Sequence, residues 1–98
     1  MVLVKLTKHD LYTKQLYDKI IDEYDSVSTN VLIQKKKRSV AEIDIVAKKG
    51  DSYDLYEVKC SFRITKAKKQ AKSFRKHFGR AIKNIYFYCG ATASLIIL

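Results

Sequence analysis

The sequence predicts one small α/β domain, with elements in the order αβββαβ and a central mixed sheet flanked by two helices. Three observations lead to this fold class. A length of 98 residues provides one hydrophobic core at most. Apolar residues make up 47% of the chain, which is too many for a disordered basic tail. Segments with a helical apolar period also lie before and after runs of β-branched residues.

The first expected element is a helix over residues 7–24. Thr7 can cap its start, and Asp10 follows three positions later, as in a capping box. Apolar residues then recur every four positions, at Tyr12, Leu16, Ile20 and Tyr24. This spacing predicts a helix that packs one face on a sheet.

Three strands are expected next, over residues 27–34, 40–47 and 53–60. The last two flank the turn sequence Lys48-Lys49-Gly50-Asp51-Ser52. A two-residue turn at Gly50 and Asp51 would pair Lys49 with Ser52. The loop between the first two strands is expected to hold the basic run Lys35-Lys36-Lys37-Arg38.

A second helix is expected over residues 65–78, followed by a strand over residues 85–89. The helical stripe consists of Ala67, Ala71, Phe74 and Phe78, and Gly79 is placed to end the helix. The apolar run at residues 95–98 is either a last strand or an interface tail.

Charge is divided unevenly along the chain. Residues 1–57 hold all ten acids and ten of the Lys and Arg residues, whereas residues 58–98 hold ten Lys and Arg and no acid. The formal net charge of +10 therefore lies in the second segment. Such segregation indicates a polyanionic partner, with nucleic acid as the first candidate. The alternative is a lysine-rich surface that aids solubility.

Several other classes of protein are excluded or disfavoured by the sequence. No run of about 18 apolar residues exists, so a membrane span is not expected. Without a recognisable signal peptide, the protein is expected in the cytoplasm, of a host cell if the chain is viral, with Cys60 and Cys89 as reduced core residues. His9 and His77 lack partners at zinc-ligand spacing. No phosphate-binding glycine loop and no serine-hydrolase motif occurs.

The hairpin over residues 40–60 carries charges where a buried sheet would carry apolar side chains. Alternation puts Glu42 and Asp44 on one face of the first strand and Ile43 and Ile45 on the other. The Gly50–Asp51 turn then places Asp44 opposite Glu57, and Glu42 opposite Lys59. A two-step slip would instead pair Glu42 with Glu57, so an acid pair survives in either register.

Two directly opposed carboxylates, with Cβ atoms about 4.5–5.5 Å apart, repel each other and favour binding of a divalent cation. Hard oxygen ligands suit Mg²⁺ or Mn²⁺, which can also bind phosphate oxygens. Lys59 beside the pair could orient or deprotonate a water molecule, or neutralise a transition state. The alternative is an exposed hairpin face that carries paired charges without a site.

The segment from Ala41 to Cys60 resembles the core signature of the PD-(D/E)XK nuclease superfamily. The matching residues are Ala41-Glu42-Ile43-Asp44-Ile45-Val46-Ala47, Gly50-Asp51 and Leu55-Tyr56-Glu57-Val58-Lys59. The nearest look-alikes are the archaeal and viral Holliday-junction resolvases and a related small bacterial nuclease-like family. The resemblance implies a minimal restriction-endonuclease-like core. It also implies that Asp44, Glu57 and the Val58 carbonyl hold the metal, that Lys59 is catalytic and that Gln70 faces the site.

Two features depart from the family pattern. Many members carry Glu early in the first helix as an added metal ligand, and here the candidates are Asp10 and Glu23. Asp10 has an equally good structural role in the capping box. The Pro that often precedes the metal-binding Asp is replaced by Ile43.

The expected function is therefore that of a metal-dependent endonuclease acting on branched or duplex DNA, in particular on Holliday junctions. A symmetric homodimer is expected, because two cuts across a junction need two sites. The expected DNA contacts are Lys35, Lys36, Lys37, Arg38, Arg63, Lys66, Lys69, Gln70 and Lys72. The alternatives are a non-catalytic nucleic-acid-binding module of the same fold and a basic protein that recruits an acidic protein.

Overall fold

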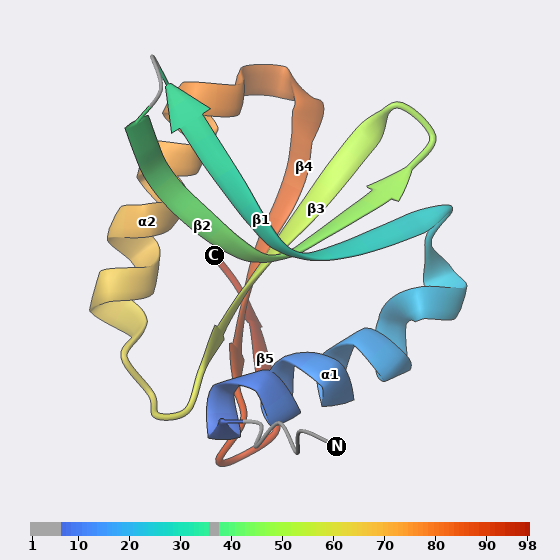
Figure 1. Cartoon of the computed structure of the whole chain (residues 1–98), viewed down its shortest axis with the longest axis vertical. Helices are drawn as coiled ribbons and strands as arrows, with labels where there is room; N and C mark the ends of the chain where they lie inside the picture. The colour runs from blue at the N-terminus through green and yellow to red at the C-terminus, as the bar shows by residue number, and fades with distance from the viewer. Residues whose placement is uncertain (1–6, 36–37) are drawn as a thin grey trace, which may run out of the picture.

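A computed structural model describes residues 7–35 and 38–98 of the chain (Figure 1). Within these residues, two α-helices and two short 3-10 helices accompany five strands. In chain order the elements are α1 (Lys8–Ile20), η1 (Ile21–Glu23), β1 (Ser26–Lys35), β2 (Arg38–Lys49), β3 (Ser52–Lys59), α2 (Ile64–Phe78), η2 (Gly79–Ala81), β4 (Ile82–Cys89) and β5 (Ser94–Ile97). The α/β class is confirmed. A further strand, β5, follows the predicted series.

The strands form one mixed sheet in the spatial order β1-β2-β3-β4-β5. β3 and β4 are parallel, and the crossover between them contains α2, whereas the other neighbours are antiparallel. α1 packs on one face through a cluster that includes Leu16, Ile20 and Tyr56. α2 packs on the opposite face, where Phe74 shares a cluster with Leu55. The sheet thus lies between the helices (Figure 1).

The start of α1 follows the prediction. The Thr7 hydroxyl accepts a hydrogen bond from the backbone N–H of Asp10, at 3.1 Å, and the Asp10 carboxylate accepts from the Thr7 N–H, at 3.4 Å. This capping box satisfies two backbone donors that have no partner within the helix. The α-helix ends earlier than predicted, at Ile20, and continues as the short 3-10 helix η1.

The β2–β3 hairpin also follows the predicted register. Lys49 pairs with Ser52, and the ladder continues to Ile45 opposite Tyr56. Gly50 occupies the turn with φ of +60°, a conformation that costs glycine little. Lys35 and Arg38 pair with each other at the ends of β1 and β2, instead of lying in a loop. Lys36 and Lys37 lie outside the described residues.

The side chains of β2 do not lie on the faces that strict alternation predicted. Ile45 packs in the cluster under α1, but Ile43 packs in the cluster under α2. On the neighbouring strand, Asn30 adopts a positive φ of 54°, between the pairs Thr29–Ile45 and Val31–Ile43. The left-handed backbone at Asn30 interrupts the regular pleat beside Asp44, so strict alternation fails across this point.

The second helix follows the predicted pattern, whereas β4 begins three residues before the predicted strand, at Ile82. Ala67, Ala71 and Phe74 are buried on α2, and Gly79 ends the helix with φ of +62°. β5 pairs with β4, and its side chains alternate: Ile96 packs toward the core, whereas Leu95 and Ile97 are exposed. Cys89 is buried as expected, but Cys60 is exposed, because it lies just beyond the end of β3.

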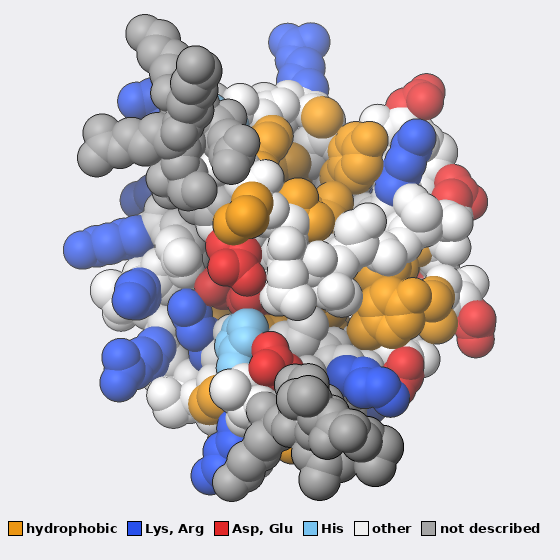
Figure 2. Space-filling model, in the orientation of Figure 1, with side chains coloured by type: hydrophobic (Ala, Val, Ile, Leu, Met, Phe, Trp, Pro, Cys, Tyr) orange, Lys and Arg blue, Asp and Glu red, His pale blue; other side chains and the backbone are white. Residues whose placement is uncertain are grey.

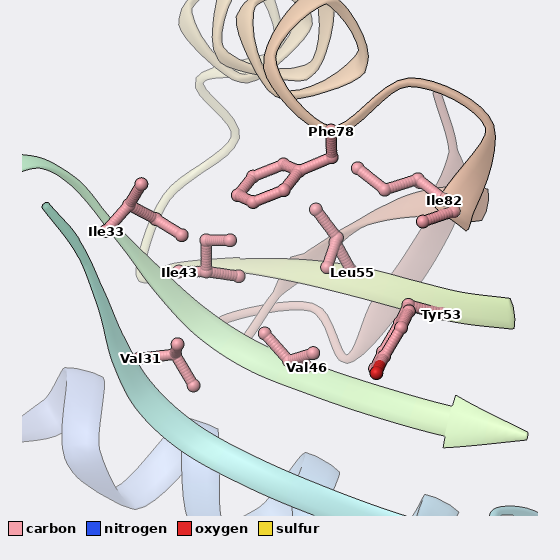
Figure 3. A pocket seen from close by; sticks show the side chains of 9 residues that line it. Val31, Ile33, Ile43, Val46, Tyr53, Leu55, Phe78 and Ile82 are labelled. Carbon is pink, nitrogen blue, oxygen red and sulfur yellow. The ribbon is translucent and has the colours of Figure 1, made fainter. Parts of the chain in front are cut away.

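An apolar hollow of about 170 Å³ lies between the sheet and the end of α2 (Figure 3). Its lining includes Ile43, Leu55 and Phe78, with Tyr53 at its edge. None of the helices in the described ranges 7–35 and 38–98 combines the length and the apolar character that crossing a membrane requires.

Candidate active site

The candidate site lies where β2 and β3 stop pairing through their backbones. Beyond the Ile45–Tyr56 pair, the Asp44 carboxylate accepts a hydrogen bond from the Val58 N–H, with a distance of 2.8 Å at Oδ2. At this point a hydrogen bond to the Asp44 side chain takes the place of a backbone hydrogen bond between the strands. The Asp44 side chain is 9% exposed. A carboxylate held at this depth is a strong candidate for a functional group.

Glu57 is the second buried carboxylate, with a side chain 7% exposed. The Lys59 ammonium lies 3.0 Å from Glu57 Oε1, whereas Glu57 Oε2 is buried and has no hydrogen-bond partner among the described residues. Burial raises the pKa of Glu57, and the neighbouring charge of Asp44 raises it further, while Lys59 acts in the opposite direction. The predicted pair of Asp44 with Glu57 is not part of the ladder, which ends at Ile45 and Tyr56, but the charge of Asp44 still acts on Glu57.

Glu42 is not paired with Lys59 as the register predicted. It lies opposite Leu32 of β1 and is exposed, because β2 has already diverged from β3 at this level. Lys59 instead pairs with Glu57 on its own strand, two residues away on the same face. The acid pair at the site is therefore Asp44 with Glu57.

His9 joins the site from α1 and is the residue that the sequence reasoning missed. Its Nε2 atom lies 3.2 Å from Asp44 Oδ1 and 3.1 Å from the Val58 carbonyl oxygen. A signal for this position was present in the sequence. His9 precedes Leu16 by seven residues, about two helical turns, so it extends the buried stripe of Thr13, Leu16 and Ile20 toward the start of the helix.

The two acids considered as added ligands lie elsewhere. Asp10 is engaged in the capping box with Thr7. Glu23 is exposed in η1 and borders a surface hollow with Tyr24, Asp54 and Lys83. In that region the Tyr24 hydroxyl donates to Asp54 Oδ2 at 2.6 Å.

Gln70 lies on α2 beside the buried residues Ala67 and Ala71. Its Oε1 atom is buried, and among the described residues it has no hydrogen-bond partner. Glu57 Oε2 and Gln70 Oε1 are thus two buried acceptors without a donor, a state that normally costs stability unless water or an ion satisfies them.

The basic residues predicted to contact DNA are exposed where their side chains are described. Arg63 precedes the first residue of α2, and Lys66, Lys69 and Lys72 lie along the helix. Figure 2 shows Lys and Arg side chains gathered on the side of the molecule where α2 lies, and several Asp and Glu side chains on the opposite side. Basic and acidic side chains are therefore separated in the folded molecule as well as along the sequence.

The residues present are compatible with a divalent cation, although they do not form a finished metal centre. Among the described residues, no three His, Cys, Asp or Glu side chains are grouped closely enough to hold a metal ion. Asp44, Glu57 and the Val58 carbonyl nevertheless supply hard oxygen donors, one of which, Glu57 Oε2, lacks a partner in that part of the chain. A cation at these oxygens would relieve the repulsion that raises the pKa of Glu57.

No protein-family model matches the chain, and a search of curated proteins finds no significant match.

Proposed function

We propose that the protein is a metal-dependent endonuclease that hydrolyses DNA phosphodiester bonds. The observation that carries the proposal is the pair of buried carboxylates, Asp44 and Glu57, with the Lys59 ammonium 3.0 Å from Glu57 Oε1. Buried charges are costly and are usually paired or bound to metals. Burial raises the pKa of Glu57, and the nearby Asp44 carboxylate raises it further; buried acids perturbed in this way are typical of catalytic sites.

Asp44, Glu57 and the Val58 carbonyl are the groups that would hold Mg²⁺ or Mn²⁺. When bound, such an ion lowers the pKa of a water molecule and stabilises negative charge on a phosphate. Lys59 contributes a fixed positive charge, 23% exposed, that can orient a water molecule or neutralise charge on the phosphate in the transition state. Asp44 is held in position by the Val58 N–H, so the site is organised before substrate arrives.

DNA is the proposed substrate because of the charge of the second segment. Residues 58–98 carry ten Lys and Arg and no acid, and Arg63, Lys66, Lys69 and Lys72 are exposed on or beside α2. Phosphate backbones bind such surfaces through release of counterions. Selectivity for branched DNA, and cleavage by a homodimer, are the finer parts of the proposal and follow from the resemblance to junction resolvases.

A non-catalytic DNA-binding module is the second candidate function. One observation favours it: His9 and Lys59 already contact Asp44 and Glu57, so each carboxylate has a basic partner without a metal ion. In such a module the former site would be a buried ion-pair network. DNA binding would then persist without cleavage and without dependence on divalent cations.

The test is incubation of the full chain with four-way junction, duplex, flap and single-stranded DNA, in Mg²⁺, Mn²⁺ or EDTA. The nuclease proposal predicts cleavage that requires a divalent cation and is lost in Asp44→Asn. This variant, purified in parallel, also controls for contaminating nucleases. Binding of DNA without cleavage in either cation would identify the binding module. Cleavage of the four-way junction in preference to duplex would support the finer proposal.

A further inference from the structure

The short loop between β3 and α2 carries an exposed aromatic side chain, Phe62. The loop consists of residues 60–63 and connects Lys59, at the end of β3, to the first residue of α2 (Figure 1). Phe62 is 55% exposed. In the part of the chain that the structure describes, it is the only Phe or Tyr side chain that is exposed. The proposed function assigns no role to it.

The Phe62 ring is held next to the strands that carry the candidate site. It packs edge-to-face against the ring of Phe87, with centroids 5.4 Å apart and planes at 82°. Phe87 is completely buried in the cluster under α2, and it pairs with Glu57 in the parallel β3–β4 ladder. Paired residues on neighbouring strands, about 4.8 Å apart, point to the same face of a sheet. The Phe62 ring therefore lies beside the residue that neighbours Glu57.

The charges around this ring distinguish it from an ordinary exposed apolar residue. Single exposed apolar side chains are common on protein surfaces and by themselves indicate nothing. Here Lys59 precedes the ring by three residues, Arg63 follows it directly and is exposed, and Lys66 lies in the first turn of α2. No acid occurs from residue 58 to residue 98. A flat apolar surface is thus combined with cations and no carboxylate in the same segment.

This combination matches the chemistry of a nucleotide in a single strand. Proteins bind such strands with cations that follow the phosphates and with aromatic rings on which the bases stack. Contacts to phosphates alone would account for the cations but not for the ring. Inside a duplex, the faces of each base are covered by its neighbours, so a surface side chain can stack only on a base that has left the helix. Flaps, forks and single strands supply such bases.

We propose that Phe62 is a stacking platform for one unpaired nucleobase, and that it makes the protein prefer DNA with an unpaired nucleotide next to the candidate active site. The inference rests on the proposed function for its substrate, DNA, but not on cleavage, because stacking needs no metal ion. The base would lie on the exposed part of the ring, and Arg63 would contact a phosphate of the same strand. Phe87 supports the ring from the core, so little side-chain freedom is lost on binding.

The direct test is the fluorescence of Phe62→Trp, because the chain contains no other Trp. A single-stranded oligonucleotide added in EDTA should quench the indole, since the base stacks on it. The matched control is Leu32→Trp, which places an equally exposed indole on β1, at the opposite edge of the sheet from β5. Its emission should not change when the same oligonucleotide binds.

The preference is tested by fluorescence anisotropy in EDTA, with a fork that has unpaired arms and a blunt duplex. We expect Phe62→Ala to weaken binding of the fork about 5- to 140-fold, the scale for loss of one stacked base, and to change duplex binding much less. Phe62→Tyr should keep the preference, whereas Phe62→Leu, which is apolar but not flat, should lose it. The salt dependence should not change, because the ring neutralises no phosphate.

The outcomes separate this inference from the proposed function. Equal losses for fork and duplex in Phe62→Ala, full affinity in Phe62→Leu, or an indole in Phe62→Trp that bound DNA does not quench would each overturn the role of Phe62. Cleavage in Mg²⁺ would then still support the nuclease. If Phe62→Leu converted a dimer to a monomer in light scattering, the ring would be a contact between two copies, which also contradicts the proposal. Failure of the wild-type protein to bind any DNA would overturn both. Phe62→Trp keeps an aromatic ring against Phe87, so its fluorescence decides the matter even if Phe62→Ala does not fold.

Discussion

Glu57 is the residue at which stability and proposed function oppose each other. Its pKa is raised in the folded protein by burial and by Asp44, so the folded state binds its proton more tightly than the unfolded chain does. The stability linked to this proton is fully present below the ordinary carboxyl pKa and is lost as the pH rises through the raised value. Above the ordinary carboxyl pKa, the ionisable Glu57 side chain therefore destabilises the metal-free protein.

Glu57→Gln is accordingly expected to abolish cleavage while raising the Tm of the metal-free protein at pH 7. Glutamine keeps the shape of the side chain but carries no charge to repel Asp44. Thermal unfolding in EDTA and in Mn²⁺ would measure both effects: the ion should raise the Tm of the wild-type protein and have a smaller effect on the variant. DNA affinity should stay near the wild-type value. Full cleavage by the variant would contradict the site assignment.

Lys59→Ala is expected to slow cleavage by at least about two orders of magnitude, the usual scale for a positioned proton-transfer or charge-stabilising group. Metal binding should persist, because Lys59 contacts Glu57 and supplies no metal ligand. Single-turnover cleavage and calorimetry would measure the two quantities separately. If the variant lost metal affinity as well, Lys59 would be a structural partner of Glu57.

At the scale of elements, the end of β4 is packed tightly against α1. A Cβ atom added to Gly90 would overlap the ring of Tyr12. The Gly90 N–H also donates to the Lys59 carbonyl oxygen at 2.9 Å, so this contact links α1 to the strand that carries the site.

Gly90→Ala should therefore destabilise the protein by about 1–3 kcal/mol, the usual cost of overpacking a filled space. Chemical denaturation would measure the free energy of unfolding. In the Tyr12→Leu background, which removes the ring, the same glycine substitution should cost much less. An equal loss in both backgrounds would show that the overlap is relieved by a shift elsewhere.

The exposed face of α2 is the element proposed to contact DNA. Lys69 and Lys72 are exposed on it. Each phosphate contact contributes about 0.9 to the slope of log affinity against log salt, so replacing both lysines with alanine should flatten the slope by about 1.8.

The matched control for α2 is the double alanine variant at Lys48 and Lys49, which are exposed beside the β2–β3 turn. Its slope should stay at the wild-type value. Fluorescence anisotropy at several salt concentrations would measure both variants. An unchanged slope in the Lys69 and Lys72 variant would show that this helix faces solvent in the complex.

At the scale of the whole molecule, β5 forms one edge of the sheet and carries no charged side chain. Ile96 packs against the core, while Leu95 and Ile97 are 49% and 62% exposed on the other face. An edge with this composition is prone to pair with a second chain. The predicted homodimer would bury these two side chains.

The variant Leu95→Lys/Ile97→Lys is expected to convert the dimer to a folded monomer. It changes the exposed face alone, whereas truncation after Ser94 would also remove Ile96 from the core. Leu32→Lys, on the opposite edge strand and 59% exposed, is the control and should remain dimeric. Light scattering at micromolar concentration would measure the mass. A monomeric wild-type protein would contradict the dimer.

Local signals in the sequence were sufficient to predict most of the elements and one hairpin register. The capping box at Thr7 and Asp10, the Gly50–Asp51 turn and the helix end at Gly79 all lie where the pattern predicts. Each depends on hydrogen bonds or backbone angles within a few residues, so the chemistry of neighbouring side chains is enough to specify it. The turn set the ladder as far as Ile45 and Tyr56, one step before the predicted pair of Asp44 and Glu57.

Contacts between distant segments decided the rest. The kink opposite Asn30 sends Ile43 and Ile45 to different faces, and the divergence of β2 from β3 takes Glu42 away from Lys59. His9 reaches the site because α1 packs across the sheet with its first turn over Val58. Periodicity specifies which face of an element is apolar, but it does not specify which residue at the end of that face meets which strand. That relation is set by packing of the folded chain, and it is what brings His9 to Asp44 and to the Val58 carbonyl oxygen.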